Sequence, residues 1–144
     1  MKSQRVSLIT LGVADLERAK AFYGALGWVV EEETPTVVFY DLGGMKLGFF
    51  GLGSLAEDQG RPDAALGTGA MTLAQNFADR AAVDAAIALA EAAGATVLKR
   101  PEAVFWGGYS GYYADPDGHV WEVSHNPFWP LDEDGKILPA AAKP

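Results

Sequence analysis

An internal duplication is the feature that most constrains the fold of this chain. Two stretches, Phe39–Phe50 (FYDLGGMKLGFF) and Tyr112–Val123 (YYADPDGHVWEV), each predict an aromatic strand, a glycine turn and an apolar strand. They align with Gly44 on Gly118 and one residue of slack in the turn. A unit of this size buries only one face of its sheet under its own helix, so the other faces of two such units are expected to combine.

A strand and a helix precede the first copy. The β-branched, apolar segment 6–13 predicts a buried strand, and Asp15 is typical of the N-cap of a helix that ends before Gly27. Three further strands are predicted at 28–31, 36–41 and 45–50. The last two are joined by a two-glycine turn, Gly43–Gly44, so the first half is predicted to be β-α-β-β-β.

The second half repeats this order of elements. A strand is predicted at 70–77, and Asp79 is the expected N-cap of a helix that ends before Gly94. A further strand is predicted to start at 96–98, and two more are predicted at 109–114 and 119–124, with a turn at Pro116–Gly118. The predicted fold class is therefore α+β, with two tandem βαβββ modules.

The length and the apolar content favour one domain over residues 1–144. Module one is expected at about 5–51 and module two at about 68–126, joined by a polar, aperiodic linker at 52–67. The tail, 127–144, is rich in proline and contains large apolar side chains: Phe128, Trp129, Leu131, Ile137 and Leu138. These side chains either cover part of the same domain or reach across a dimer interface.

Composition excludes several classes of partner. The net charge is −8 at pH 7, which repels nucleic acid and anionic membranes but suits a cationic small molecule. The absence of cysteine excludes disulfides and thiolate chemistry. No apolar run is long enough for a signal peptide or a membrane span, so a cytoplasmic location is expected.

With these elements in place, the chain resembles the vicinal oxygen chelate superfamily, which includes glyoxalases, bleomycin resistance proteins and extradiol dioxygenases. The resemblance depends on the paired modules and on two segments, LITLGVADLERAKAFYGALGW (Leu8–Trp28) and ADPDGHVWEVSHNP (Ala114–Pro127). It covers nearly all of residues 5–127. It implies that the modules form a cupped mixed sheet with the helices outside, that the protein is a homodimer, and that the active site lies inside the cup.

The resemblance also implies where a metal ion would bind. Metal-dependent members take one ligand from the first strand and one from the last strand of each module. The matching positions in this chain are Leu8, Gly48, Thr72 and Glu122, of which only Glu122 is a ligand type. A transition metal needs three or four ligands, so no metal or other cofactor is expected there. A magnesium or calcium ion held by Glu122 and waters is the alternative.

Strand alternation separates both histidines from Glu122. His119 and His125 share the side of their strand with Trp121 and Val123, which is the packing side, so local hydrogen bonds and capping are expected of them. Glu122 itself has two interpretations. It either meets a backbone amide, Arg or Lys as a structural contact, or it contacts a ligand and is the candidate catalytic base.

Other residues are candidate ligand contacts. Trp106 and Tyr109 belong to the aromatic, glycine-rich segment Val104–Tyr113 (VFWGGYSGYY) and offer stacking faces, although they could equally belong to the core. Asn76 is preferred over Gln75 because it shares strand parity with Thr72. The full set of expected ligand contacts is Leu8, Gly48, Thr72, Asn76, Trp106, Tyr109 and Glu122.

Three functions are consistent with the sequence. The first is a metal-independent protein, similar to glyoxalases and bleomycin resistance proteins, that binds a cationic or aromatic small molecule in the cleft between its modules. The second is a lyase, isomerase or dioxygenase that acts on a small oxygenated metabolite. The third is a structural or partner-binding module without catalysis.

Overall fold

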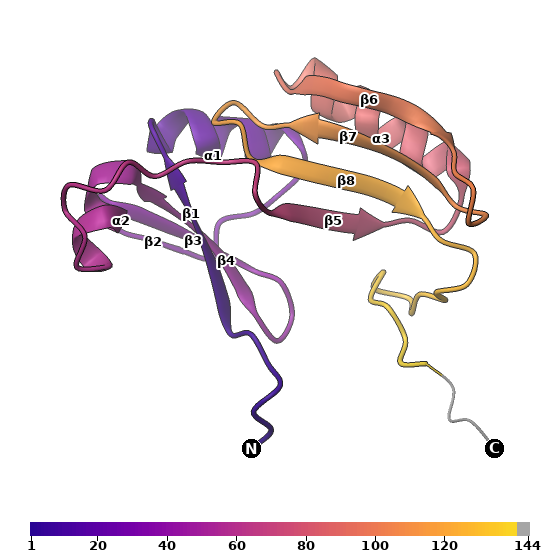
Figure 1. Cartoon of the computed structure of the whole chain (residues 1–144), viewed down its shortest axis with the longest axis horizontal. Helices are drawn as coiled ribbons and strands as arrows, with labels where there is room; N and C mark the ends of the chain where they lie inside the picture. The colour runs from indigo at the N-terminus through magenta and orange to yellow at the C-terminus, as the bar shows by residue number, and fades with distance from the viewer. Residues whose placement is uncertain (141–144) are drawn as a thin grey trace. The chain divides into compact units, whose positions relative to one another are not determined.

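The computed structural model describes residues 1–140 of the 144, and the chain divides into two compact units, Met1–Thr68 (unit 1) and Gly69–Pro144 (unit 2) (Figure 1). Each unit contains one four-stranded mixed sheet. The strand order is β1-β4-β3-β2 in unit 1 and β5-β8-β7-β6 in unit 2. In both sheets the first strand of the unit is parallel to the last, and the remaining pairs are antiparallel. The two units therefore have the same topology, which confirms the predicted α+β fold of two modules.

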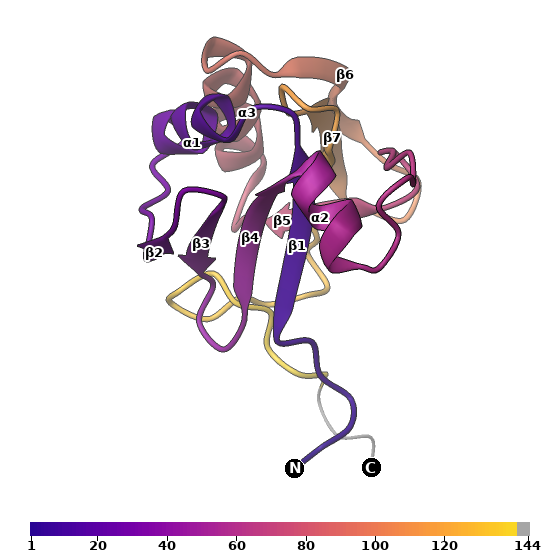
Figure 2. The same cartoon turned by 90° about the vertical axis from the view of Figure 1, so that its left-hand side faces the viewer.

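The elements of unit 1 are β1 (Leu8–Val13), α1 (Leu16–Ala25), β2 (Glu32–Glu33), β3 (Val37–Asp41), β4 (Lys46–Gly51) and α2 (Leu52–Asp58). Figure 2 shows the strands β2, β3, β4 and β1 following one another across the sheet. As predicted, Asp15 caps α1, because its side chain accepts a hydrogen bond of 3.1 Å from the Arg18 amide. Gly27, with φ 93°, follows the end of the helix.

The strand predicted at 28–31 is wrong in position, since β2 begins at Glu32. The indole ring of Trp28 is instead part of the aromatic core. Its centroid lies 5.4 Å from that of Tyr23 and 5.5 Å from that of Tyr40. Because the Trp28 ring packs against α1 and β3, the strand starts at Glu32, four residues later than predicted.

The linker predicted at 52–67 begins with a helix, α2 (Leu52–Asp58). Its two leucines pack on β1 at Gly12, where a Cβ atom would lie 2.7 Å from Leu52 Cδ2 and 3.3 Å from Leu55 Cδ2. Ala56 is buried as well. The apolar positions of this short helix are too few to give a clear period in a polar, glycine-containing sequence, and contact with the sheet stabilises it.

The core of unit 1 lies between α1 and one face of the sheet. Leu47 and Phe49, which alternate along β4, are fully buried on this face. Tyr23 of α1 stacks on Phe49, with ring centroids 4.6 Å apart. We call the opposite face of each sheet, turned away from α1 or α3, its distal face.

The elements of unit 2 are β5 (Thr72–Asn76), α3 (Arg80–Ala92), β6 (Thr96–Ala103), β7 (Tyr109–Ala114) and β8 (Val120–His125). Asp79 caps α3 as predicted, accepting a hydrogen bond of 2.8 Å from the Ala82 amide. The buried side of α3 consists of Val83, Ile87 and Ala90 and packs on the sheet. Trp121 and Val123 of β8 are buried on the same side.

Strand β6 begins at Thr96, as predicted, and extends to Ala103. It is an edge strand, and its pairing with β7 is irregular around Lys99 and Glu102. An edge position and a bulge both tolerate a proline, here Pro101. Gly111 of β7 allows this close approach, because a Cβ there would lie 2.8 Å from the Lys99 carbonyl oxygen.

The tail after β8 folds back on itself within the described residues. Leu131 and Ile137 form an antiparallel bridge, and the Leu138 amide donates a hydrogen bond of 2.9 Å to the Pro130 carbonyl. The Phe128 ring covers Gly107 in the β6–β7 connection, so at least this side chain packs on its own unit. No helix within residues 1–140 is long and apolar enough to cross a membrane.

Candidate functional site

A tyrosine and a glutamate form a hydrogen-bonded pair on the distal face of unit 2. Tyr112 of β7 lies directly opposite Glu122 of β8 in the sheet. The Tyr112 hydroxyl donates a hydrogen bond of 2.5 Å to Glu122 Oε2. Both side chains are partly buried. A bond this short to a carboxylate is among the stronger hydrogen bonds of a protein.

The contact with Glu122 raises the pKa of the Tyr112 hydroxyl. The hydrogen bond to the Glu122 carboxylate is the main cause that raises the pKa of Tyr112, followed by burial. Tyr112 therefore keeps its proton at neutral pH and acts as the donor. The structural contacts expected of Glu122 were an amide, Arg or Lys, and the partner found is a tyrosine.

Tyr112 was not among the ligand contacts expected from the sequence. The turn Asp115–His119 sets the register of β7 on β8: the Asp115 carboxylate accepts the amides of Asp117 and His119, each at 2.9 Å. Counting outward from this turn pairs Tyr112 with Glu122. The sequence contained this signal, because the turn and both strands were predicted.

Thr72 and Asn76 of β5 lie on the same face as Glu122. Thr72 is opposite Val120, and Asn76 is opposite Ser124, two residues to either side of Glu122 along β8. Gln75 is opposite the buried Val123 and therefore belongs to the helix side. The structure thus places Thr72, Asn76 and Glu122 on one face, as expected from their parity.

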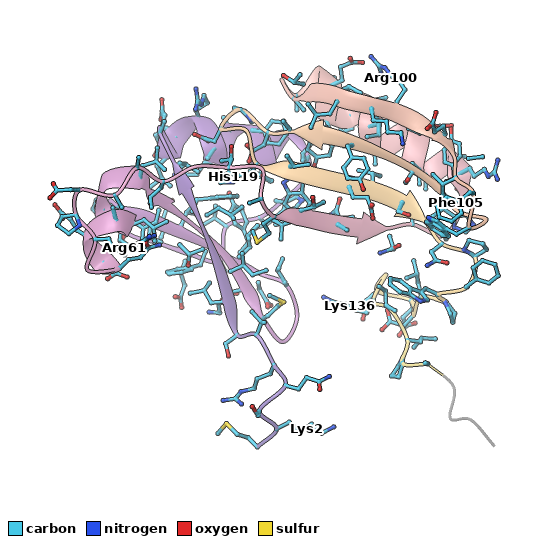
Figure 3. All side chains as sticks on the ribbon, viewed as in Figure 1. Lys2, Arg61, Arg100, Phe105, His119 and Lys136 are labelled. Carbon is cyan, nitrogen blue, oxygen red and sulfur yellow. The ribbon has the colours of Figure 1, made fainter. Side chains whose placement is uncertain are left out.

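The two histidines lie at opposite ends of the β8 region. His119 is in the β7–β8 turn (Figure 3), where its backbone amide bonds to Asp115. His125 Nδ1 lies 2.9 Å from the Phe77 carbonyl oxygen. A carbonyl only accepts, so Nδ1 is the protonated nitrogen. The contact of His119 is local, as predicted, whereas His125 bonds to a residue 48 positions away in the sequence, which differs from the capping role expected of it.

Tyr109 is not on the distal face, contrary to the expectation that it lines the ligand site with Glu122. It is opposite His125 in β8, and its hydroxyl donates a hydrogen bond of 2.6 Å to Asp84 of α3. The Arg80 guanidinium lies 5.1 Å from its ring centroid. Tyr109 is an odd number of residues from Tyr112, so the pleat turns it towards the helix.

Trp106 lies in the β6–β7 connection with 40% of its surface exposed. Its indole ring packs over Gly108, where a Cβ would lie only 2.0 Å from the ring. Its neighbour in the sequence, Phe105 (labelled in Figure 3), is fully exposed. Trp106 thus covers a glycine next to β7.

Leu8 and Gly48 lie on the distal face of unit 1. A Cβ on Gly48 would be 3.1 Å from the Phe39 ring and 3.6 Å from Leu8 Cδ1. Phe39 therefore fills the space where a side chain at position 48 would project. The distal face of unit 1 is apolar at this point, whereas the corresponding position of unit 2 is Glu122.

The family model for the Glyoxalase/Bleomycin resistance protein/Dioxygenase superfamily matches residues 5–123. The chain belongs to this superfamily. A glyoxalase-related enzyme from Fulvimarina pelagi is 38% identical, covering 96% of this chain and 99% of that one, with a TM-score of 0.87. A lactoylglutathione lyase from Agrobacterium tumefaciens is 26% identical over 91% of this chain and all of its own, with a TM-score of 0.69. The comparison with curated proteins gave no match.

The residues at the metal-binding positions of the superfamily do not fit a transition metal in this chain. Leu8 and Gly48 have no donor atom in their side chains, and Thr72 offers only a hydroxyl. The Glu122 carboxylate already accepts the Tyr112 hydroxyl. Within residues 1–140, moreover, no three His, Cys, Asp or Glu side chains are grouped to hold a metal ion. We therefore assign no chemical step to a metal.

Proposed function

We propose that this glyoxalase-superfamily protein binds a small organic molecule on the distal face of unit 2, with Glu122 and Tyr112 as its polar anchor and without a metal ion. The observation that supports this most is the 2.5 Å hydrogen bond between their side chains on a partly buried surface. Among the described residues, no basic side chain bonds to the Glu122 carboxylate. This carboxylate can therefore accept a hydrogen bond from a ligand.

The pair offers complementary hydrogen-bonding groups. Glu122 Oε2 accepts from Tyr112, which leaves Oε1 to accept from a hydroxyl, amide or ammonium group of a ligand. The Tyr112 oxygen can in turn accept a second bond. Ala74, opposite Glu122 in β5, leaves room beside the carboxylate. A ligand with adjacent donor and apolar parts suits this surface.

The residues around Glu122 and Tyr112 favour a ligand with a polar group at one end. Along the distal face, Asn76, Ser124 and Ser110 form the next row of the sheet. On the other side of Tyr112 the Lys99 ammonium forms an ion pair with Glu102 at 3.1 Å, which offsets its charge. The uncompensated charge at the pair is negative, which favours a cationic or hydrogen-bond-donating ligand.

A second candidate function, proton-transfer catalysis, is favoured by the same pair. A protonated tyrosine beside a carboxylate places a proton donor and a proton acceptor within 2.5 Å of each other. The similarity to a lyase from Agrobacterium tumefaciens is consistent with an enzyme. In this function Glu122 is the base, and Tyr112 holds the carboxylate in position.

A thermal-shift screen of cationic, aromatic and oxygenated small molecules, followed by calorimetry on the strongest hit, tests the proposal. We expect E122Q to weaken binding about 10-fold or more, because a hydrogen bond to a charged group is lost. E57Q, an exposed carboxylate on α2, is the matched control and should bind as the wild type does. Equal affinity of E122Q and the wild type would remove Glu122 from the site, and a silent screen would favour a non-catalytic structural module.

A further inference from the structure

A hollow in unit 2 lies apart from Glu122, between the ends of two strands and the tail. Its volume is about 590 Å³, and it is bordered by the end of β5, the end of β8 and residues up to Gly135. Pockets for small molecules in proteins usually measure roughly 300–1,000 Å³. The hollow is therefore large enough for a small organic ligand.

The tail wall of this hollow is a folded structure. The Asp132 amide donates to the Lys136 carbonyl at 2.8 Å, and Leu131 bridges to Ile137. The Asp132 carboxylate accepts the amides of Asp134 and Lys136, each at 2.9 Å. Asn126 fixes the start of the tail by accepting the Phe128 amide at 2.9 Å. These contacts hold the wall in place before a ligand binds.

The lining combines an aromatic surface with hydrogen-bond acceptors. Trp129 lines the hollow and has 53% of its surface exposed. His125 lines it too, and its Nδ1 bonds to the Phe77 carbonyl, so the other ring nitrogen is the one available to a ligand. The amide side chains of Asn76 and Asn126 are also in the lining.

The charge of the lining is negative. Asp132, Glu133 and Asp134 all border the hollow, and no lysine or arginine does. Asp132 is engaged in the turn, whereas Glu133 and Asp134 form no ion pair with a described residue. Lys136 follows the lining in the chain, on the tail in Figure 3, but is not part of it.

We propose that this hollow is a second binding site, for an organic ammonium ion. The indole ring attracts such a cation through its π face, and the Glu133 and Asp134 carboxylates supply the opposite charge. A bare metal ion is disfavoured, because in the described part of the chain no three carboxylate or imidazole groups are positioned to enclose one. This site does not include Glu122, so a negative result for one of the two proposed sites leaves the other proposal untouched.

The test uses benzyltrimethylammonium as the cationic probe, with benzenesulfonate and benzyl alcohol as anionic and neutral controls. Binding is followed on the whole protein by the NMR signals of the tryptophan indole N–H groups. We expect benzyltrimethylammonium to shift the Trp129 signal in a saturable way, and raising the salt from about 0.05 to about 0.5 M to weaken it. Failure to bind, or equal binding of benzenesulfonate, would overturn the proposal.

Matched variants assign the site. W129L should weaken binding about fivefold or more, whereas W106L, which removes another partly exposed tryptophan, should not. The double variant E133Q/D134N should also weaken binding at least about threefold, whereas E57Q/D58N, an adjacent acidic pair on α2, should not. Wild-type affinity in both W129L and E133Q/D134N would refute the site. If W129L does not fold, the affinity of E133Q/D134N alone decides whether the site exists.

Discussion

The Tyr112 hydroxyl donates a 2.5 Å hydrogen bond to the Glu122 carboxylate across the β7–β8 strand pair. This relationship gives Glu122 a fixed orientation on the distal face of unit 2. It also distinguishes the two modules, because the position of module one that corresponds to Glu122 is Gly48, covered by the Phe39 ring. A duplicated framework thus presents a polar group on one sheet and an apolar patch on the other.

Replacing Tyr112 by phenylalanine should destabilise the protein modestly. The substitution leaves a partly buried carboxylate without its donor, so the free energy of unfolding at neutral pH should fall by about 1–2 kcal/mol. Urea unfolding monitored by circular dichroism measures this change. Y109F, which removes an exposed hydroxyl bonded to Asp84, is the control and should cost less. A Y112F protein as stable as the wild type would show that the hydrogen bond contributes nothing.

Stability should decline in alkaline solution. Burial raises the pKa of Tyr40 and of Tyr113, and the bond to Glu122 raises that of Tyr112. Each folded tyrosine then retains a proton that the unfolded chain loses above about pH 10, so the free energy of unfolding falls as the pH rises beyond that value. Urea unfolding between about pH 8 and 11 should show this decline, with a shallower slope in Y112F. A flat profile would contradict the raised pKa values.

Tyr40 offers a prediction of the opposite sign. Its hydroxyl is buried and has no hydrogen-bond partner among the described residues. Y40F removes a polar atom whose burial is uncompensated, while the ring keeps its contacts with Tyr23 and Phe49. The free energy of unfolding should stay the same or rise by up to about 1 kcal/mol. A loss greater than about 1 kcal/mol would reveal a partner for the hydroxyl.

Gly12 should be intolerant of a side chain because α2 packs directly on it. The added atoms of G12V would overlap Leu52, so we expect a loss of about 1–3 kcal/mol in the free energy of unfolding. Gly24 in α1 is the matched control, since nothing lies within 4 Å of the position that a Cβ would take there. G24A should stabilise the protein by about 0.5–1 kcal/mol. Equal effects of the two changes would argue against the packing of α2 on β1.

The elements that the sequence predicted well are those with strong local signals. Asp15 and Asp79 cap their helices as expected, and the glycine turns define both hairpins. The helix α2 was missed because its stability depends on Gly12, a contact distant in the sequence. The strand predicted at 28–31 was wrong in position for a similar reason, because the Trp28 ring packs into the aromatic core.

The site was predicted in part. Glu122 and Thr72 were expected from the resemblance to the superfamily, and Asn76 from its strand parity with Thr72; the three residues lie on one face. Tyr109 was expected on the same face as Glu122. The register of β7 on β8 instead places Tyr109 on the helix side. Tyr112 could have been found from this same register. The tail hollow, by contrast, depends on how residues 126–138 fold back, which no local pattern indicates.

The most direct test of the central claim is a crystal structure of the protein with the compound that gives the largest thermal shift. We expect a donor group of this compound to lie within hydrogen-bond distance of the Glu122 carboxylate, on the distal face of unit 2, with Tyr112 still bonded to Oε2. Structures in which none of the compounds that bind the protein contacts Glu122, or a metal ion coordinated by Glu122 together with an imidazole, would contradict the proposed site.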